Sequence, residues 1–153
     1  MSKVYTWDEA KLYCDRLAKS SKKVVFSNGC FDVLHVGHVR YLNEARACGD
    51  FLLLALNSDG SVKRLKGNSR PFFSVEDRAE VLLALRSVDA VVVFEQDTPL
   101  DLLEYLRPPV YVKGGDYEVQ SLLEYPLVSA YGGEVRCLSF YEGYSSSSII
   151  DRV

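Results

Sequence analysis

Short apolar runs alternate with helical patterns along the whole chain, and this alternation is what most constrains the fold. The apolar runs predict strands at residues 24–27, 51–57, 88–94 and 110–113, and Gly132-Gly133 returns the chain to a fifth strand at residues 134–138. Strands that alternate with helices form parallel sheets, because each helix carries the chain back to the start of the next strand in a right-handed crossover. The sequence therefore predicts an α/β fold, an open parallel sheet of about five strands with helices on both faces.

A single domain, residues 1–153, accounts for the chain. Its length is enough to bury a core without cross-links, and 48% hydrophobic with 25% charged residues is typical of a globular protein. Thr6 and Glu9 have the spacing of a capping box, in which each side chain binds the other residue's backbone N–H. We expect residues 1–22 to form an amphipathic helix and a turn that pack on this domain.

Charge and composition limit the partners. The formal net charge is −3, which argues against nucleic acid as a partner. The apolar runs are too short to span a bilayer and the acidic N-terminal segment does not resemble a signal peptide, so we expect a cytoplasmic protein without a membrane partner. No C-x-x-C pair occurs among Cys14, Cys30, Cys48 and Cys137, which argues against a zinc site or a disulfide framework.

The chain's two histidines, His35 and His38, lie where a predicted strand and tight turn lead into a helix that begins near Val36. Backbone N–H groups at a helix start have no intrahelical partner, and the helix dipole favours an anion there. Imidazole groups at that position are donors suited to a phosphoryl group. We therefore expect a phosphate site. The alternative is that one histidine caps the helix and the other packs in the core.

A cationic segment follows the second strand. Residues 61–71 read SVKRLKGNSRP, with cations at Lys63, Arg64, Lys66 and Arg70, and Gly, Asn and Pro favour a mobile loop. We expect this loop to close over a triphosphate, and the alternative is a solvated charged surface. Arg78 follows in the first turns of a helix capped by Ser74, where the dipole disfavours a cation. Arg78 is therefore predicted to have an anionic partner, either a carboxylate or the substrate.

Two later segments also suggest ligand contacts at strand ends. Gly114-Gly115-Asp116-Tyr117 follows the fourth strand, and adjacent glycines let a ligand approach the backbone, although a simple tight turn is an alternative. Gly143, Tyr144 and the hydroxyl run of residues 145–148 open a final helix, which predicts a second anion site, although serine runs are also common in linkers. Open α/β sheets bind ligands at the carboxyl ends of their strands, where all these segments lie.

The segment from Asn28 to His38, NGCFDVLHVGH, resembles the G-x-F-D-x-x-H-x-G-H signature of the nucleotidylyltransferase superfamily. Over nearly its full length the chain is also similar to bacterial D-glycero-β-D-manno-heptose 1-phosphate adenylyltransferases. That similarity is carried by residues 28–38, 57–59, 64–67 with 70–71, 86–89, 113–117, and Gly143 with the hydroxyl run. It implies a Rossmann-like sheet and transfer of AMP from ATP to a heptose 1-phosphate, with release of pyrophosphate. We expect the free-standing form of this activity, not fused to the kinase domain that often accompanies it.

The resemblance also implies residue roles. It assigns catalysis to His35, His38 and Lys66. It assigns nucleotide binding to the two histidines together with Gly29, Cys30, Phe31, Gly115, Asp116, Gly143, Ser145, Ser146 and Ser147. It suggests contacts with the acceptor for Asp32, Lys63, Arg70, Arg78 and Lys113. The cofactor would be Mg²⁺, held mainly by phosphate oxygens and water, with no metal ligand from the protein. The chain departs from the family by Ser146 and Ser147 in place of two threonines and by the bulky Tyr144.

Three other functions remain open at this point. A cytidylyltransferase acting on glycerol 3-phosphate or another phosphorylated alcohol shares the histidine motif. A nucleotide-binding module without turnover would also fit, and a flavoprotein would share only the architecture. The family often forms dimers, and residues 86–89 resemble a segment at the subunit contact of cytidylyltransferases, so we expect a homodimer. The alternative for residues 86–89 is a helix end that simply enters a strand.

Overall fold

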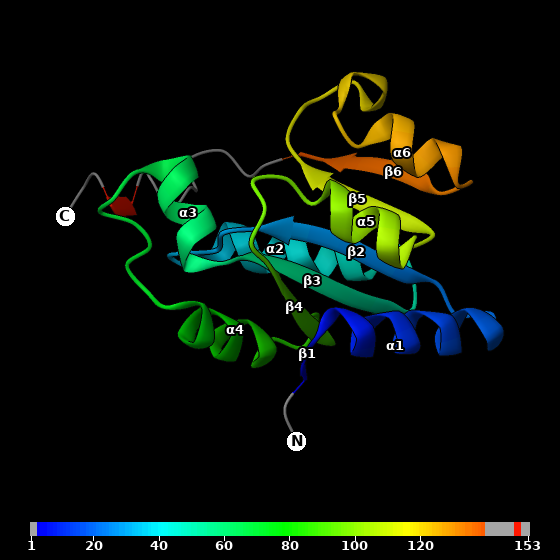
Figure 1. Ribbon diagram of the computed structural model, residues 1–153, viewed down its shortest axis with the longest axis horizontal. Helices are drawn as coiled ribbons and strands as arrows, with labels where there is room; N and C mark the ends of the chain where they lie inside the picture. Colours follow the sequence, from blue (N-terminus) through cyan, green and yellow to red (C-terminus); the bar gives the residue numbers. More distant parts are fainter. Residues whose placement is uncertain (1–2, 140–148, 151–153) are drawn as a thin grey trace.

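The computed structural model describes residues 3–139 and 149–150 and shows an α/β fold (Figure 1). Six parallel strands in these residues form one sheet in the order β1-β4-β3-β2-β5-β6. The strands are β1 (Val4–Tyr5), β2 (Val24–Gly29), β3 (Phe51–Asn57), β4 (Ala90–Phe94), β5 (Val110–Gly114) and β6 (Glu134–Leu138). The predicted parallel sheet is confirmed, and its five expected strands correspond to β2 to β6. The sequence missed β1, because two residues at the sheet edge have no readable apolar pattern.

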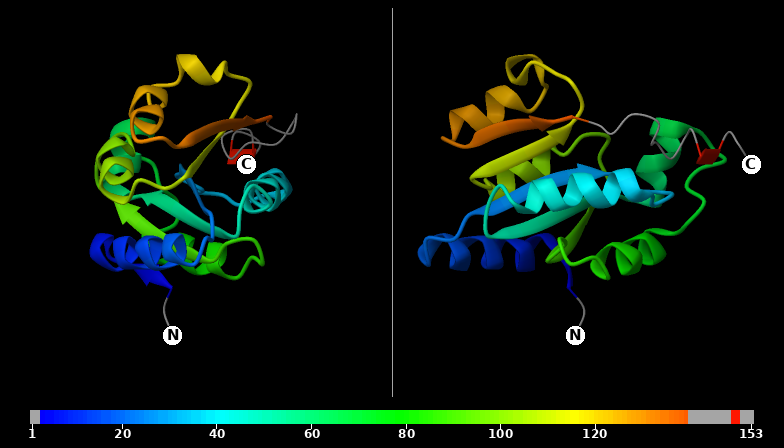
Figure 2. Two further views of the ribbon diagram at one scale, coloured as in Figure 1. Left: turned by 90° about the vertical axis from the view of Figure 1, so that its right-hand side faces the viewer. Right: turned by 180° about the vertical axis from the view of Figure 1, so that it is seen from behind.

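Helices cover both faces of the sheet (Figure 2). One face packs against α1 (Trp7–Lys19), α5 (Leu100–Leu106) and α6 (Tyr125–Ala130), and the other against α2 (Val36–Arg46) and α4 (Val75–Leu83). Successive strand residues alternate between the two cores: Phe26 packs in the first and Val25 in the second. Both faces are apolar because both are covered. No helix in the described residues is long and apolar enough to cross a membrane.

The cationic segment is more regular than predicted. Residues 59–66 form α3 (Asp59–Lys66), so the expected mobile loop is wrong for this stretch. Ser58 caps the helix, its Oγ accepting a hydrogen bond from the Ser61 N–H at 3.1 Å. Asp59 lies in the first turn and Lys63, Arg64 and Lys66 in the last, an arrangement that complements the helix dipole. The loop begins only at Gly67 and reaches α4 through residues 68–74. A short 3₁₀ helix, η1 (Val119–Ser121), lies between β5 and α6.

Strand order determines where a ligand can enter. From β2 the chain moves outward through β3 and β4, and then returns to the other side of β2 at β5. The crossovers after β2 and before β5 therefore diverge, and in open α/β sheets ligands bind in the crevice that opens at the carboxyl ends of such a strand pair. The strand ends face the side of the molecule where α3 lies (Figure 1).

Candidate active site

The two histidines lie together at the start of α2, directly after the loop that leaves β2. His35 is the N-cap residue in an extended conformation (φ −142°, ψ 174°), and its side chain makes no capping hydrogen bond. The imidazole rings of His35 and His38 stack with centroids 3.8 Å apart and an interplanar angle of 24°. The first turn of α2 carries no acidic side chain. The side chain of His35 therefore does not cap α2 in this structure, and a helix start with no acidic side chain in its first turn is a position that favours an anion.

Both imidazoles are neutral at pH 7. Burial lowers the pKa of His38 to about 4, with further lowering by the neighbouring His35 and by Lys66. Burial also lowers the pKa of His35. Two charged rings at stacking distance would repel each other, so the neutral forms are favoured. Nδ1 of His38 is buried without a hydrogen-bond partner in the described part of the chain. The pair can therefore donate hydrogen bonds to a phosphoryl group.

The end of β2 forms a closely packed wall beside the histidines. A Cβ on Gly29 would lie 2.7 Å from the ring of Phe31, so no larger residue fits while the ring stays there. Phe31 has a left-handed backbone (φ 47°), and its ring tilts against His38 with centroids 5.1 Å apart. Burial raises the pKa of Cys30, although the positive charges of Lys66, Arg78 and Arg70 oppose the rise. These three cations therefore surround the strand end that precedes the histidines.

Asp32 holds the loop between α3 and α4. It is 1% exposed and accepts hydrogen bonds from Arg70 Nε at 2.6 Å, Phe72 N–H at 2.9 Å and Phe73 N–H at 3.1 Å. Burial alone would raise its pKa, but these hydrogen bonds outweigh burial and the pKa is lowered. Nη2 of Arg70 is buried without a partner in the described residues. Asp32 thus positions the loop, and one nitrogen of Arg70 remains a donor that the described residues do not use.

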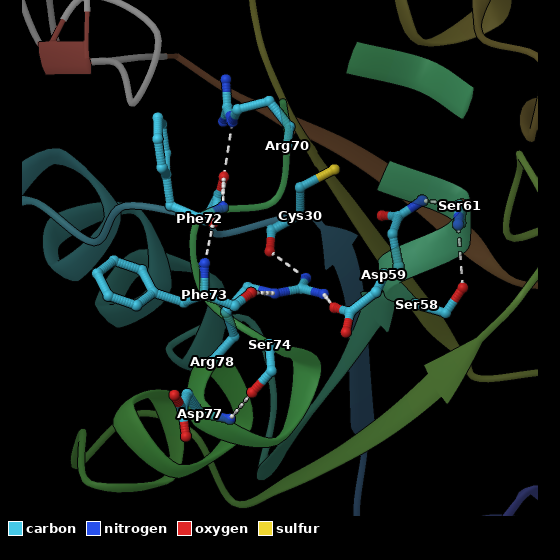
Figure 3. Close-up of polar contacts among 12 residues, drawn as sticks. Cys30, Ser58, Asp59, Ser61, Arg70, Phe72, Phe73, Ser74, Asp77 and Arg78 are labelled. Atoms are coloured by element: carbon cyan, nitrogen blue, oxygen red, sulfur yellow. Dashed lines mark hydrogen bonds and ion pairs between the residues drawn. The ribbon is translucent and has the colours of Figure 1, made fainter. Parts of the chain in front are cut away.

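Arg78 joins three elements near the site (Figure 3). It is 2% exposed and donates from Nε to the Phe73 carbonyl at 3.1 Å, from Nη1 to the Cys30 carbonyl at 2.7 Å, and from Nη2 to Asp59 Oδ1 at 2.8 Å. The predicted anionic partner is confirmed as a carboxylate. Because each nitrogen has a protein partner, Arg78 acts in this structure as a brace, and its expected contact with a substrate stays a prediction.

The remaining predicted residues are spread around the same edge. Lys63 and Lys66 are exposed on α3 and make no ion pair within the described residues, whereas Arg64 turns away to Asp97. Gly115 has φ +130°, and the ring of Tyr117 covers the position a Cβ would take. Asp116 accepts a hydrogen bond from Ser139 Oγ at 2.9 Å. The predicted residues Gly143, Ser145, Ser146 and Ser147 lie outside the described residues.

Sequence reasoning missed a polar cluster on the opposite side of β2 from α3. Lys113, which was predicted to contact the acceptor substrate, forms an ion pair with Glu124 at 2.8 Å. Glu124 is 1% exposed. Tyr111 and Asn28 join the same cluster. Nothing in the sequence separates Glu124 from a solvated helical glutamate. The described residues bring together no group of three or more His, Cys, Asp or Glu side chains that could hold a metal ion.

Comparisons with known proteins give a consistent result. The family model described as cytidylyltransferase-like matches residues 26–152. "Bifunctional protein HldE" of Geobacter sulfurreducens is 54% identical over 132 residues, which cover 86% of this chain and 27% of that protein. "Bifunctional protein HldE" of Pelobacter propionicus is 47% identical over 152 residues, covering 99% and 31%. The chain therefore spans less than a third of the length of these relatives.

Two solved structures share the architecture. A lipopolysaccharide core biosynthesis protein from Thermoplasma volcanium GSS1 superposes with a TM-score of 0.66 at 25% identity, covering 79% of this chain and 99% of that one. A pantoate-beta-alanine ligase from Francisella tularensis, complexed with beta-gamma ATP and beta-alanine, superposes with a TM-score of 0.69, covering 100% and 73%. At 13% identity, the second similarity concerns the fold alone.

Proposed function

The chain belongs to the cytidylyltransferase-like family, and on that premise we propose that it transfers AMP from ATP to D-glycero-β-D-manno-heptose 1-phosphate, giving ADP-heptose and pyrophosphate. The observation that carries the proposal is the stacked, neutral His35–His38 pair at the start of α2, with Lys66 close enough to lower the pKa of His38. The similarity to the HldE proteins and to a lipopolysaccharide core biosynthesis protein supports a sugar phosphate as the acceptor.

The reaction needs no protein nucleophile. An oxygen of the sugar 1-phosphate, already anionic at neutral pH, attacks the α-phosphorus of ATP. The new P–O bond forms as the bond to the α,β-bridging oxygen breaks, and pyrophosphate leaves with that electron pair. Two N–H donors from the imidazoles and the first N–H groups of α2 would stabilise the charge on the α-phosphoryl oxygens. Because burial lowers the pKa of His38, we assign it the donation of a hydrogen bond at neutral pH.

The cations have a matching role. Lys66 would neutralise the phosphates from the end of α3, and the buried Nη2 of Arg70 would donate to a phosphate oxygen from the neighbouring loop. Lys63 and Lys113 are further candidates for the acceptor, and Gly143 with Ser145 to Ser147 for the β- and γ-phosphates. We propose Mg²⁺ as the cofactor, held by triphosphate oxygens and water, the ligands this ion prefers. When bound, it would add positive charge at the leaving pyrophosphate.

A cytidylyltransferase is the second candidate, and the description of the family model favours it. The test is pyrophosphate release by the purified protein with Mg²⁺, with ATP and CTP each paired with heptose 1-phosphate and glycerol 3-phosphate. We expect release only with ATP and the heptose phosphate. Release only with CTP and glycerol 3-phosphate would retain the mechanism and replace both substrates. ATP binding without release from any pair would identify a binding module.

We also propose a homodimer, in keeping with the cytidylyltransferase-like family. Part of the segment at residues 86–89 faces the interior, because Ser87 is buried. Asp89 accepts a hydrogen bond from the Leu52 N–H at 2.8 Å and forms an ion pair with Arg46 at 2.9 Å. Arg86 is exposed and available to a partner. Sedimentation equilibrium should give twice the chain mass, and a monomer at all concentrations would contradict this. A reaction that consumes ATP fits the cytoplasmic location expected from the sequence.

A further inference from the structure

A second polar site lies at the carboxyl ends of β2 and β5, on the face covered by α1, α5 and α6. Phe26 on β2 pairs in register with Tyr111 on β5. Two residues further along each strand stand Asn28 and Lys113, and because side chains alternate, both lie on that same face. Glu124, at the start of α6, completes the group. These residues border the crevice where the strand order reverses, across β2 from the cationic helix α3.

The hydrogen bonds of this group are incomplete. Oε1 of Glu124 accepts from Lys113 Nζ at 2.8 Å and from the Tyr111 hydroxyl at 3.2 Å. The same hydroxyl lies 2.8 Å from Asn28 Oδ1, so its single proton can serve only one of these acceptors at a time. Oε2 of Glu124 is buried and has no partner in the described part of the chain. One carboxylate oxygen is therefore buried with an unused capacity to accept hydrogen bonds.

A structural role does not explain this carboxylate. Glu124 is the N-cap residue of α6, yet its side chain makes no capping hydrogen bond. A buried ion pair is often matched or improved in stability by apolar residues of the same size, because removing two charges from water is costly. The pair is also asymmetric: the Lys113 side chain is 35% exposed and that of Glu124 is 1% exposed. The lysine is thus the accessible member of the pair, and the carboxylate is the buried one.

We propose that Lys113 and Glu124 form a polyol subsite that binds neighbouring hydroxyl groups of a sugar. Lys113 Nζ donates to one hydroxyl oxygen, and a second hydroxyl donates to Glu124. A hydroxyl group both donates and accepts, so neighbouring hydroxyls can accept from the ammonium and donate to the carboxylate. The inference rests on the proposed function, because both proposed substrates carry neighbouring hydroxyls: the ribose of the nucleotide and the acceptor sugar.

The test measures equilibrium binding by calorimetry, which does not require turnover. Wild type, Glu124→Gln and Lys113→Gln are titrated with ATP, 2′,3′-dideoxy-ATP and heptose 1-phosphate. Glu134→Gln is the matched control, because it removes the carboxylate of an ion pair with Arg136 that is exposed on the next strand. A hydrogen bond to a charged group predicts a loss of affinity of about 10-fold or more for one sugar ligand in Glu124→Gln, and no change in the control.

The ligands distinguish the two sources of the hydroxyls. If the subsite binds the ribose, Glu124→Gln weakens ATP and leaves dideoxy-ATP as in wild type. If it binds the acceptor, only heptose 1-phosphate is weakened. Affinities within about twofold of wild type for every ligand, or equal weakening of ATP and dideoxy-ATP, would overturn the proposal. Lys113→Gln gives the same readout if Glu124→Gln does not fold.

Failure of the proposed function is seen separately. In that case the ligands bind and Glu124→Gln still weakens the binding of one of them, but pyrophosphate is not released. A wild-type protein that binds neither ATP nor heptose 1-phosphate would contradict both proposals.

Discussion

Replacing Asp32 with asparagine should destabilise the protein strongly. In the structure this buried carboxylate accepts one hydrogen bond from the Arg70 guanidinium and two from the backbone N–H groups of Phe72 and Phe73. Asparagine keeps the shape but leaves the buried Arg70 charge without its counterion. Breaking a buried ion pair by removing one partner costs about 3–5 kcal/mol. At about 2–4 °C per kcal/mol for a chain of this length, the melting temperature should fall by roughly 6–20 °C.

Urea unfolding of wild type and variant measures this difference directly. Asp97→Asn is the matched control, because it breaks an exposed ion pair with Arg64 (52% and 59% exposed side chains) and should cost under about 1 kcal/mol. The double variant Asp32→Asn with Arg70→Met removes both charges and should recover part of the loss. A loss under about 1 kcal/mol for Asp32→Asn would refute the claim that this carboxylate holds the loop.

Three further predictions concern residues around the strand ends. The pKa of His38 is about 4 when folded and 6.5 unfolded, so its contribution to stability is complete above pH 6.5 and is lost as the pH falls towards 4. Over this pH range the free energy of unfolding, measured in urea, should fall by up to about 3 kcal/mol less in His38→Gln than in wild type. Equal decreases in the two proteins would contradict the burial of a neutral ring. Arg78→Met removes three hydrogen bonds and should lower the free energy of unfolding by about 3 kcal/mol or more; a loss as small as that of Asp97→Asn would rule out the brace. Gly115→Ala combines a strained φ of +130° with a clash against Tyr117 and should cost more than Gly67→Ala, which has φ +103° and open space; equal costs in thermal unfolding would exclude the ring contact.

The sequence predicted the parts of the fold that depend on local pattern. The continuous apolar run of residues 51–57 predicted β3 at the bounds the structure has, because a strand covered on both faces consists mainly of apolar residues. The bounds of β6 followed from the turn at Gly132-Gly133 that precedes it. An anionic partner for Arg78 followed from the helix dipole, and the structure shows that this partner is the Asp59 carboxylate. The same reasoning missed helix α3, because the glycine, asparagine and proline after it were given more weight than the cap at Ser58.

Long-range contacts account for what could not be predicted. Asp32 and Arg70 were predicted to contact the acceptor substrate. Only the folded chain shows that they bind each other, although they lie 38 residues apart in the sequence. The cluster of Asn28, Tyr111, Lys113 and Glu124 joins two strands and a helix, and no spacing in the sequence links these residues. Their side chains meet only because β2 and β5 are neighbours in the sheet.

We propose above all that the histidine pair stabilises the transferred phosphoryl group. The most direct measurement is kcat for pyrophosphate release from ATP and heptose 1-phosphate with His38→Ala. Val36→Ala, an exposed change in the same helix, serves as the control. Loss of one preorganised donor predicts a decrease of about 10²- to 10³-fold with an unchanged far-ultraviolet circular dichroism spectrum. A His38→Ala protein that turns over like wild type would contradict the account.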